Sequence, residues 1–228
     1  CEAAEEKAKS GAMKKFTIQN TCGKARAGIL ATEHGKIKTP FFMPVATKGS
    51  VKLLTNEEME EAGTQCMISN SFVLWMKPGL EVIEKSKGLH GFMSWKKPMF
   101  TDSGGFQVLS ESFCLALQED GVTFLNPFTG KKMLFTPELS MQIQEKIGSD
   151  VAMCLDDVPH HNDSRNIAEC VKRTHEWAAR CKKFHNNKNQ MLFGITQGST
   201  DKNLRVKSAK FINGLNFDGI AIGGLGIG

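Results

Sequence analysis

The sequence lacks several features that define whole classes of protein. No run of about 18 apolar residues occurs, which excludes a transmembrane helix. The first ten residues are charged and alanine-rich without an apolar core, so we expect residues 1–15 to form a peripheral leader rather than a secretory signal. No P-loop, nucleophile elbow or HExxH motif is present. The common short signatures of phosphate-binding loops, α/β-hydrolases and zinc proteases are therefore missing.

The cysteines of the chain do not show the spacing that is typical of a disulfide framework. The chain has 7 cysteines and no CxxC pair. An odd number of cysteines, most of them in apolar or helical stretches, argues against a disulfide framework and shows no zinc ligand set. We expect buried thiols in a reducing, cytoplasmic setting.

Length and composition describe an ordinary globular protein. The chain has 228 residues, of which 40% are hydrophobic and 23% charged, which excludes a mostly disordered chain. The net charge of +5 permits a nucleic-acid partner without demanding one. A domain holds roughly 100–200 residues, and no internal repeat or low-complexity linker marks a boundary. We therefore treat residues 16–228 as one domain.

The order of apolar runs and helical stretches predicts the architecture. The segments FTIQN, ARAGIL and KIKTP predict small strands or hairpins, with Gly35 at a turn. Later apolar runs, each typical of a short buried strand, cover residues 42–46, 66–69, 98–101, 151–155, 191–195 and 219–223. Helices are predicted after the Thr55 capping box, from Pro137 to Gly148, and over residues 166–185 and 204–214.

Alternating strands and helices predict parallel βαβ units. Six such strands favour an α/β fold of the (β/α)8 barrel type, which normally needs eight strands and about 250 residues. The chain ends after the sixth strand, in the turn GGLGIG, so we expect either a fragment or a protein whose remaining strands come from elsewhere. A doubly wound sheet of five or six strands is the alternative.

Polar groups follow one predicted strand after another. These groups are Asn70, Asp102, Asp156 with Asp157, Gln197, and Gly223 with Gly224. In barrel enzymes the chemistry lies at the carboxyl ends of the strands. The convergence of these groups is the strongest functional signal that the residues themselves carry.

The stretch TDSGGFQ supplies five candidate site residues. Asp102 offers a carboxylate and Ser103 a hydroxyl, while Phe106 offers a flat apolar face. Gly104 and Gly105 would let the backbone approach a ligand closely. A plain turn or a helix N-cap is an equal interpretation of this stretch by itself, and the position at a strand end favours function.

Two adjacent carboxylates follow the buried run VAMCL. Asp156 and Asp157 could bind a metal, act as acid and base, or accept hydrogen bonds from a nucleobase edge. They could also cap the next helix or pair with lysine. Adjacent strand residues point to opposite faces, so at most one of the two enters a given pocket. His160, His161 and Asp163 follow closely, and a solvated loop is the better interpretation than a metal site.

The remaining strand ends favour a purine ligand. The amide of Gln197 can both donate and accept hydrogen bonds, which suits a nucleobase or a sugar hydroxyl. The bare backbone at Gly224 can hold a phosphate or let a planar ligand lie against it. One carboxylate, one amide, bare backbone and one aromatic plane describe a purine pocket better than a phosphate pocket.

Taken together, these residues resemble a known family, the tRNA-guanine transglycosylases of queuosine and archaeosine synthesis. The matching segments are ARAGIL, TPFFMPVATKGSVK, SNSFVLWMKPG, GLHGFMSWKKPMFTDSGGFQ, FTPELSMQIQEKIGSDVAMCLDD, LFGITQGS and FDGIAIGGLGIG. They run in order from about Phe16 to the end of the chain. The combination of TDSGGFQ, GSD-x4-LDD and QG is highly specific, and it corresponds to the N-terminal two-thirds of the family.

The resemblance implies a fold, a reaction and roles for individual residues. The family has a (β/α)8 barrel and exchanges guanine in tRNA for a 7-deazaguanine (queuine, preQ1 or preQ0) by double displacement. Asp102 resembles the general acid/base, and Asn70 the asparagine beside the nucleophile. Asp156 and Gln197 resemble the groups that hold the N–H edge and the carbonyl of the purine. Ser103, Gly104, Gly105, Phe106 and Gly224 resemble the rest of the binding pocket.

The resemblance also implies parts that these residues do not contain. The family's nucleophilic aspartate lies in a later segment resembling FDCVxPTRxAR, and its zinc site, CxCxxC…H, also lies downstream. We therefore expect no metal ligands in this segment and a nucleophile outside it. The implied partners are tRNA, the purine base and a second subunit, as a homodimer or heterodimer. A non-catalytic, tRNA-binding subunit of a heterodimer is the alternative to an enzyme. The chain departs from the family pattern at Val73, where the family usually has a histidine.

Overall fold

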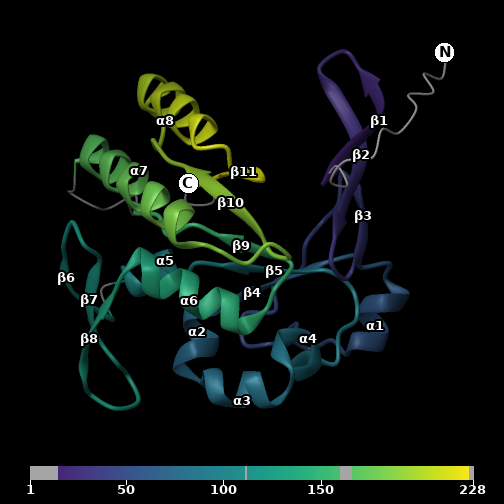
Figure 1. Cartoon of the computed structure of the whole chain (residues 1–228), viewed down its shortest axis with the longest axis horizontal. Coiled ribbons are helices and arrows are strands. Elements are labelled where there is room, and N and C mark those ends of the chain that lie inside the picture. Colours follow the sequence, from purple (N-terminus) through teal and green to yellow (C-terminus); the bar gives the residue numbers. More distant parts are fainter. Residues whose placement is uncertain (1–14, 111, 160–165, 226–228) are drawn as a thin grey trace.

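A computed structural model describes residues 15–110, 112–159 and 166–225 of the chain. They form a mixed α/β fold, in which a central parallel sheet carries helices and two smaller antiparallel sheets (Figure 1). The predicted leader lies outside the described residues except for Lys15, as do His160, His161 and Asp163.

The central sheet has five strands, all parallel, in the order β11-β10-β9-β5-β4. Its strands are β4 (Met67–Asn70), β5 (Met99–Asp102), β9 (Val151–Met153), β10 (Met191–Thr196) and β11 (Gly219–Ile222). The prediction of six strands is wrong by one. Residues 42–46 form only a single parallel bridge between Val45 and Ile68, because Pro44 lacks an N–H to extend a ladder.

Two antiparallel sheets flank the central one. The N-terminal sheet contains β1 (Phe16–Cys22), β2 (Ala25–Thr32) and β3 (Gly35–Thr39), as predicted, and it stands upright in Figure 1. The other sheet contains β6 (Cys114–Leu117), β7 (Val122–Leu125) and β8 (Lys132–Phe135). The sequence pattern did not predict this second sheet. Phe124 and Phe135 from it pack edge-on against Phe72, with ring centroids 5.2 and 5.3 Å away.

The helices connect the strands. They are α1 (Asn56–Glu61), α2 (Ser71–Met76), α3 (Leu80–Lys85), α4 (Gly88–Met93), α5 (Gly105–Val108), α6 (Pro137–Ile147), α7 (Ile167–Phe184) and α8 (Lys202–Gly214). The Thr55 capping box is confirmed, with Glu58 N–H donating to the Thr55 hydroxyl at 3.2 Å. The predicted end of α6 is also confirmed, since Gly148 takes the left-handed conformation there.

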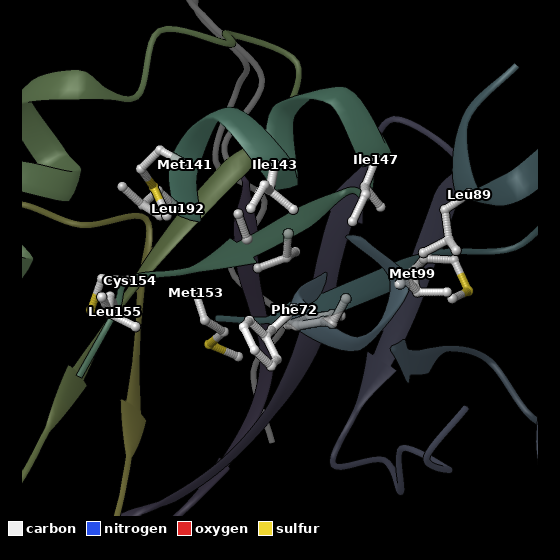
Figure 2. Packing of buried hydrophobic residues seen from close by; sticks show 14 of the residues in the cluster. Phe72, Leu89, Met99, Met141, Ile143, Ile147, Met153, Cys154, Leu155 and Leu192 are labelled. Carbon is white, nitrogen blue, oxygen red and sulfur yellow. The ribbon is translucent and has the colours of Figure 1, made fainter. Parts of the chain in front are cut away.

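The core lies between the helices and the central sheet. Figure 2 shows Met141, Ile143 and Ile147 of α6 directed toward the sheet, and all three belong to one buried cluster with Leu192 of β10. All four side chains are buried. Burying such a side chain contributes roughly 1.5–3 kcal/mol, so this packing holds the strand ends in fixed relative positions.

Candidate functional site

A cavity of about 320 Å³ lies at the carboxyl ends of the parallel strands. It collects side chains and backbone from the loops after β5, β9, β10 and β11. The predicted site residues that line it are Asp102, Ser103, Gly104, Gly105, Phe106, Asp156, Gln197 and Gly224. These predicted residues, which lie up to 122 positions apart in the sequence, therefore share one pocket.

Asp102 is the last residue of β5, and the protein holds both of its carboxylate oxygens. The Gly104 N–H donates to Oδ1 at 3.0 Å, and the Asn70 amide donates to Oδ2 at 3.2 Å. The pKa of this carboxyl is raised to about 7, mainly by burial and to a smaller extent by the charge of Asp156, while these hydrogen bonds oppose the shift. A carboxyl with a pKa near neutrality can both give and take a proton at physiological pH.

Asn70 lies behind Asp102 rather than on the cavity wall. It is the N-cap of α2, and its Oδ1 accepts a hydrogen bond from the Val73 N–H at 2.8 Å. Its Nδ2 donates to Asp102. Ser71 adds a hydrogen bond from its hydroxyl to the Asp102 carbonyl at 2.7 Å. Asn70 thus orients the carboxylate from the neighbouring strand, which parallel pairing places beside it.

The glycines after Asp102 are required by packing. Gly104 has φ = +75°, and a Cβ on it would collide with the Cβ of Phe72. A Cβ on Gly105 would lie 2.7 Å from the Asp156 carbonyl oxygen. Gly105 begins the short helix α5, and the next side chain, Phe106, is 39% exposed at the cavity. The tight turn therefore brings the Asp156 strand and the aromatic face together.

The two adjacent carboxylates point in different directions, as the strand geometry predicts. Asp156 lines the cavity, whereas Asp157 forms an ion pair with Arg173 of α7. The Asp157 N–H also donates to the Thr174 hydroxyl at 3.0 Å. Asp157 therefore anchors α7 to the sheet, and Asp156 alone is left for a ligand.

Asp156 is a buried carboxyl whose nearest polar partner is Gln197. The Gln197 Nε2 donates to Asp156 Oδ2 at 2.6 Å. Burial raises the pKa of Asp156 to about 6, with Gln197 opposing the shift and Asp157 adding to it. A ligand that offers N–H donors to this carboxylate would recover the charge stabilisation lost on burial.

Gln197 lies against the two glycines that follow β11. A Cβ on Gly223 would collide with the Gln197 amide nitrogen, and one on Gly224 would lie 2.6 Å from its oxygen. The Gln197 Oε1 is buried and has no hydrogen-bond partner among the described residues. The amide nitrogen uses one hydrogen on Asp156 and retains a second donor.

The apolar part of the wall was not predicted from the sequence. Ile68, Met153, Ile195 and Ala221 come from the strands themselves, and Val158 follows β9. Their strand positions relative to the polar ends were a usable signal, since alternate residues of a strand share a face. An apolar wall beside a few polar groups is typical of a site for a small organic ligand.

A second polar cluster, also not predicted from the sequence, lies at the opposite ends of the strands. His34 in the β2–β3 turn and His90 of α4 stack with ring centroids 3.6 Å apart and an interplanar angle of 15°. Both approach Asp150, just before β9: His34 Nδ1 lies 3.0 Å from Oδ1, and His90 Nε2 lies 3.1 Å from Oδ2, obliquely. These three residues form a group that could hold a metal ion, with ligand atoms within 4.8 Å of one another.

The cluster has the geometry of a hydrogen-bonded clamp. The N–H groups of His34 and Met99 each donate to Asp150 at 2.8 Å. Burial by itself would raise the pKa of Asp150, but His90 and the hydrogen bonds from Met99 and His34 hold it below its usual value. Nearly parallel imidazole rings do not aim their nitrogen lone pairs at one point. A shared metal would therefore require these rings to turn.

The described residues do not fit the zinc site that the resemblance implies. That site needs three cysteine thiolates and one histidine, and thiolates are the metal-binding form. The described cysteines that are buried are Cys66, Cys154, Cys170 and Cys181. Among the described residues, the group of His, Cys, Asp and Glu side chains placed closely enough to hold a metal ion is His34, His90 and Asp150, which contains no cysteine. The buried cysteines therefore do not form the thiolate set that this zinc site needs.

Comparison with known proteins identifies the family. The family model for queuine tRNA-ribosyltransferase matches residues 21–228. The queuine tRNA-ribosyltransferases of Thermotoga neapolitana and Thermotoga maritima are 49% and 47% identical over 93% of this chain and 58% of their own lengths. That of Synechococcus sp. strain CC9311 is 46% identical over 95% of this chain and 59% of its length.

The match concerns one part of those relatives, because the chain spans less than two-thirds of their length. None of the helices in the described residues is long and apolar enough to cross a membrane. The family match extends over the whole cavity, from Asn70 behind it to Gly224 on its rim. The chain therefore belongs to the queuine tRNA-ribosyltransferase family.

Proposed function

We propose that the protein containing this chain is a tRNA-guanine transglycosylase, a pentosyltransferase that exchanges guanine in tRNA for a 7-deazaguanine. The observation that carries the proposal is the pairing of Asp102 and Asp156 in one cavity, each with a raised pKa. Strongly perturbed carboxyls in a cleft are typical of functional sites. Membership of the family supports the same reaction.

The cavity complements the edge that guanine and 7-deazaguanines share. That edge presents an N1–H, a 2-amino group and a 6-carbonyl. Asp156 as a carboxylate accepts from the two donors, while the second amide hydrogen of Gln197 and the Gly224 N–H donate to the carbonyl. The exposed face of Phe106 stacks on the ring. Ser103 completes the polar wall beside Asp102.

Asp102 serves as the general acid/base of the exchange. Loss of guanine from the ribose leaves a nitrogen anion that needs a proton, and entry of the new base releases one. The nucleophile that attacks the ribose C1′ is a carboxylate from a segment outside these residues, as the family resemblance implies. Asn70 keeps Asp102 directed into the cavity.

We propose the (β/α)8 barrel as the complete fold. The described parallel strands follow their sequence order across the sheet, without the reversal that a doubly wound sheet has. Helices α6, α7 and α8 pack against one another in sequence, as on the outside of a barrel. The missing strands, the zinc site and most of the surface for tRNA belong to the rest of the protein. We expect a cytoplasmic homodimer or heterodimer.

Base exchange with labelled guanine tests the proposal. The full-length gene product that contains this chain is incubated with tRNA and labelled guanine, and incorporation into tRNA is counted. Asp102→Asn should lower the exchange rate about 10²–10⁴-fold, since this is the usual contribution of a general acid/base. If the unmutated protein binds guanine but does not exchange it, the proposed enzymatic activity is contradicted and a non-catalytic subunit is favoured.

A further inference from the structure

Arg205 of α8 connects the two loops that carry the purine-binding groups. Its Nε donates to the Ser199 carbonyl at 2.7 Å, in the loop after β10. Its Nη1 donates to the Gly223 carbonyl at 2.7 Å, and its Nη2 lies 3.5 Å from the Gly224 carbonyl, in the loop after β11. A weaker contact joins Nη1 to the Thr196 carbonyl at 3.4 Å. One side chain therefore joins both loops through their backbone.

The hydrogen bond from Arg205 to the Gly223 carbonyl affects the orientation of the Gly224 N–H, which is the proposed donor to the base. The Gly223 carbonyl and the Gly224 N–H belong to the same planar peptide unit, and in a trans peptide they point in opposite directions. Anchoring the oxygen on Arg205 therefore turns the N–H away from the arginine. Within the described part of the chain, this N–H has no hydrogen-bond acceptor. Gly223 and Gly224 both line the cavity.

A charged donor on the carbonyl also strengthens the N–H as a donor. Hydrogen bonds in a chain polarise one another, and the effect is larger where water is excluded. The guanidinium draws electron density toward the Gly223 oxygen, which leaves the Gly224 N–H more positive. The fork of Arg205 suits this position, because its rigid donors reach several carbonyls at once and an ammonium group is a single point charge.

The same face of α8 also fixes the loop that carries Gln197, the other proposed donor to the purine carbonyl. Ser208, three residues after Arg205, accepts a hydrogen bond from the Gln197 N–H at 3.1 Å through its hydroxyl. A Cβ on Gly198 would lie 2.8 Å from the Arg205 backbone nitrogen, so the loop lies directly on the helix. Residues three apart share a helix face. Helix α8 thus fixes the loops of Gln197 and Gly224 together.

We infer that Arg205 is a positioning residue for recognition of the purine 6-carbonyl, acting through the Gly223–Gly224 peptide. The inference rests on the proposed function, since it takes the guanine edge as the occupant of the cavity. It predicts a specific defect. Loss of the guanidinium should weaken the contact at position 6 of the base and leave the contacts of Asp156 with the two N–H groups in place.

Calorimetry with two bases measures this defect in the full-length gene product. Guanine is compared with 6-thioguanine, which keeps both donors and replaces the carbonyl oxygen by sulfur, a weaker acceptor. In the unmutated protein guanine should bind more tightly. Arg205→Gln should weaken guanine binding about tenfold, or 1.4 kcal/mol, and weaken 6-thioguanine binding much less. Arg205→Lys, which keeps the charge without the fork, should fall between the two proteins.

Arg180→Gln is the matched control. Arg180 is also a helical arginine on the outside of the sheet, but its guanidinium pairs with Glu138 and lies on no cavity loop. Its substitution should leave the ratio of the two affinities unchanged. Equal losses for both bases in Arg205→Gln and Arg205→Lys, with both variants folded by circular dichroism, would overturn the inference, and so would no loss at all. Failure of the unmutated protein to bind guanine would instead contradict the proposed function.

Discussion

The pH dependence of guanine binding follows from the ionisation of Asp156. Only the carboxylate form accepts hydrogen bonds from both the N1–H and the 2-amino group of guanine. Burial raises the pKa of this group to about 6. Guanine binding should therefore strengthen as pH rises through 6, because more of the protein already carries the required charge.

The magnitude follows from the titration of one group. At pH 8 a carboxyl with this pKa is almost wholly ionised, while at pH 5 only about one molecule in eleven is ionised. The dissociation constant for guanine should therefore be about tenfold larger at pH 5 than at pH 8, a free-energy difference of about 1.4 kcal/mol. Guanine itself remains neutral over this range, so the change belongs to the protein.

Isothermal calorimetry at several pH values measures the effect, and two variants assign it. Asp156→Asn should bind guanine weakly with no rise between pH 5 and pH 8, because its side chain does not titrate. Asp102→Asn should keep the rise with its midpoint little changed, because Asp102, whose pKa is raised to about 7, is mostly neutral at the pH where Asp156 titrates. The second variant separates Asp156 from the neighbouring group that titrates near pH 7.

A guanine affinity that is constant from pH 5 to pH 8 in the folded, unmutated protein would refute this reasoning. It would mean that the base does not use an ionised Asp156, or that burial does not perturb this carboxyl. A rise that survives in Asp156→Asn would assign the titration to another group. Adenine provides a further check, since its edge presents the reverse pattern and should bind at least about tenfold more weakly than guanine.

Further predictions concern stability. Asp102→Asn should raise the melting temperature at pH 8, because a carboxyl with a raised folded-state pKa destabilises the fold as it ionises. The difference should vanish below about pH 3, where the carboxyl is protonated in both the folded and the unfolded state. Asp150→Asn should lower the melting temperature at pH 7, because a buried N–H loses its acceptor at a cost of about 1–3 kcal/mol. This difference in melting temperature should shrink as the pH falls below about 4, where the carboxyl protonates in the unfolded state. Gly104→Ala should destabilise the protein by about 2 kcal/mol or more through positive φ and a collision with Phe72. Gly214→Ala, at a helical glycine where a Cβ meets nothing within 4 Å, should be neutral or slightly stabilising by thermal denaturation, and a similar loss in both glycine variants would contradict the steric explanation.

Local signals in the sequence determined the individual elements. The Thr55 capping box, Pro137 at the start of α6 and Gly148 at its end depend on contacts within a few residues, and all are confirmed. Five of the six predicted apolar runs also form strands of the central sheet, with Asp102 at the end of β5 and Asp156 three residues after β9. The resemblance to a family, carried by TDSGGFQ and LDD, is confirmed by the family match.

Only the tertiary structure decided how these groups face one another. It turned Asp156 into the cavity and Asp157 toward Arg173, where strand alternation by itself predicted only that at most one of the two enters a given pocket. The tertiary structure also left the apolar run around Val45 with a single β-bridge in place of the predicted strand. These outcomes depend on which residues lie across a strand or a helix, which local pattern does not encode.

For the same reason, the sequence did not predict the role of Arg205 or the clamp of His34, His90 and Asp150. In the sequence, Arg205 is an ordinary charged residue of an amphipathic helix. Its role depends on hydrogen bonds to the carbonyl groups of residues 6 to 19 positions away. His34, His90 and Asp150 lie up to 116 residues apart and meet only where the parallel strands begin. Chemistry at the level of residue types could thus be predicted from the sequence, whereas hydrogen-bond direction and burial, which set the pKa of each carboxyl, arise only when the strands are brought together.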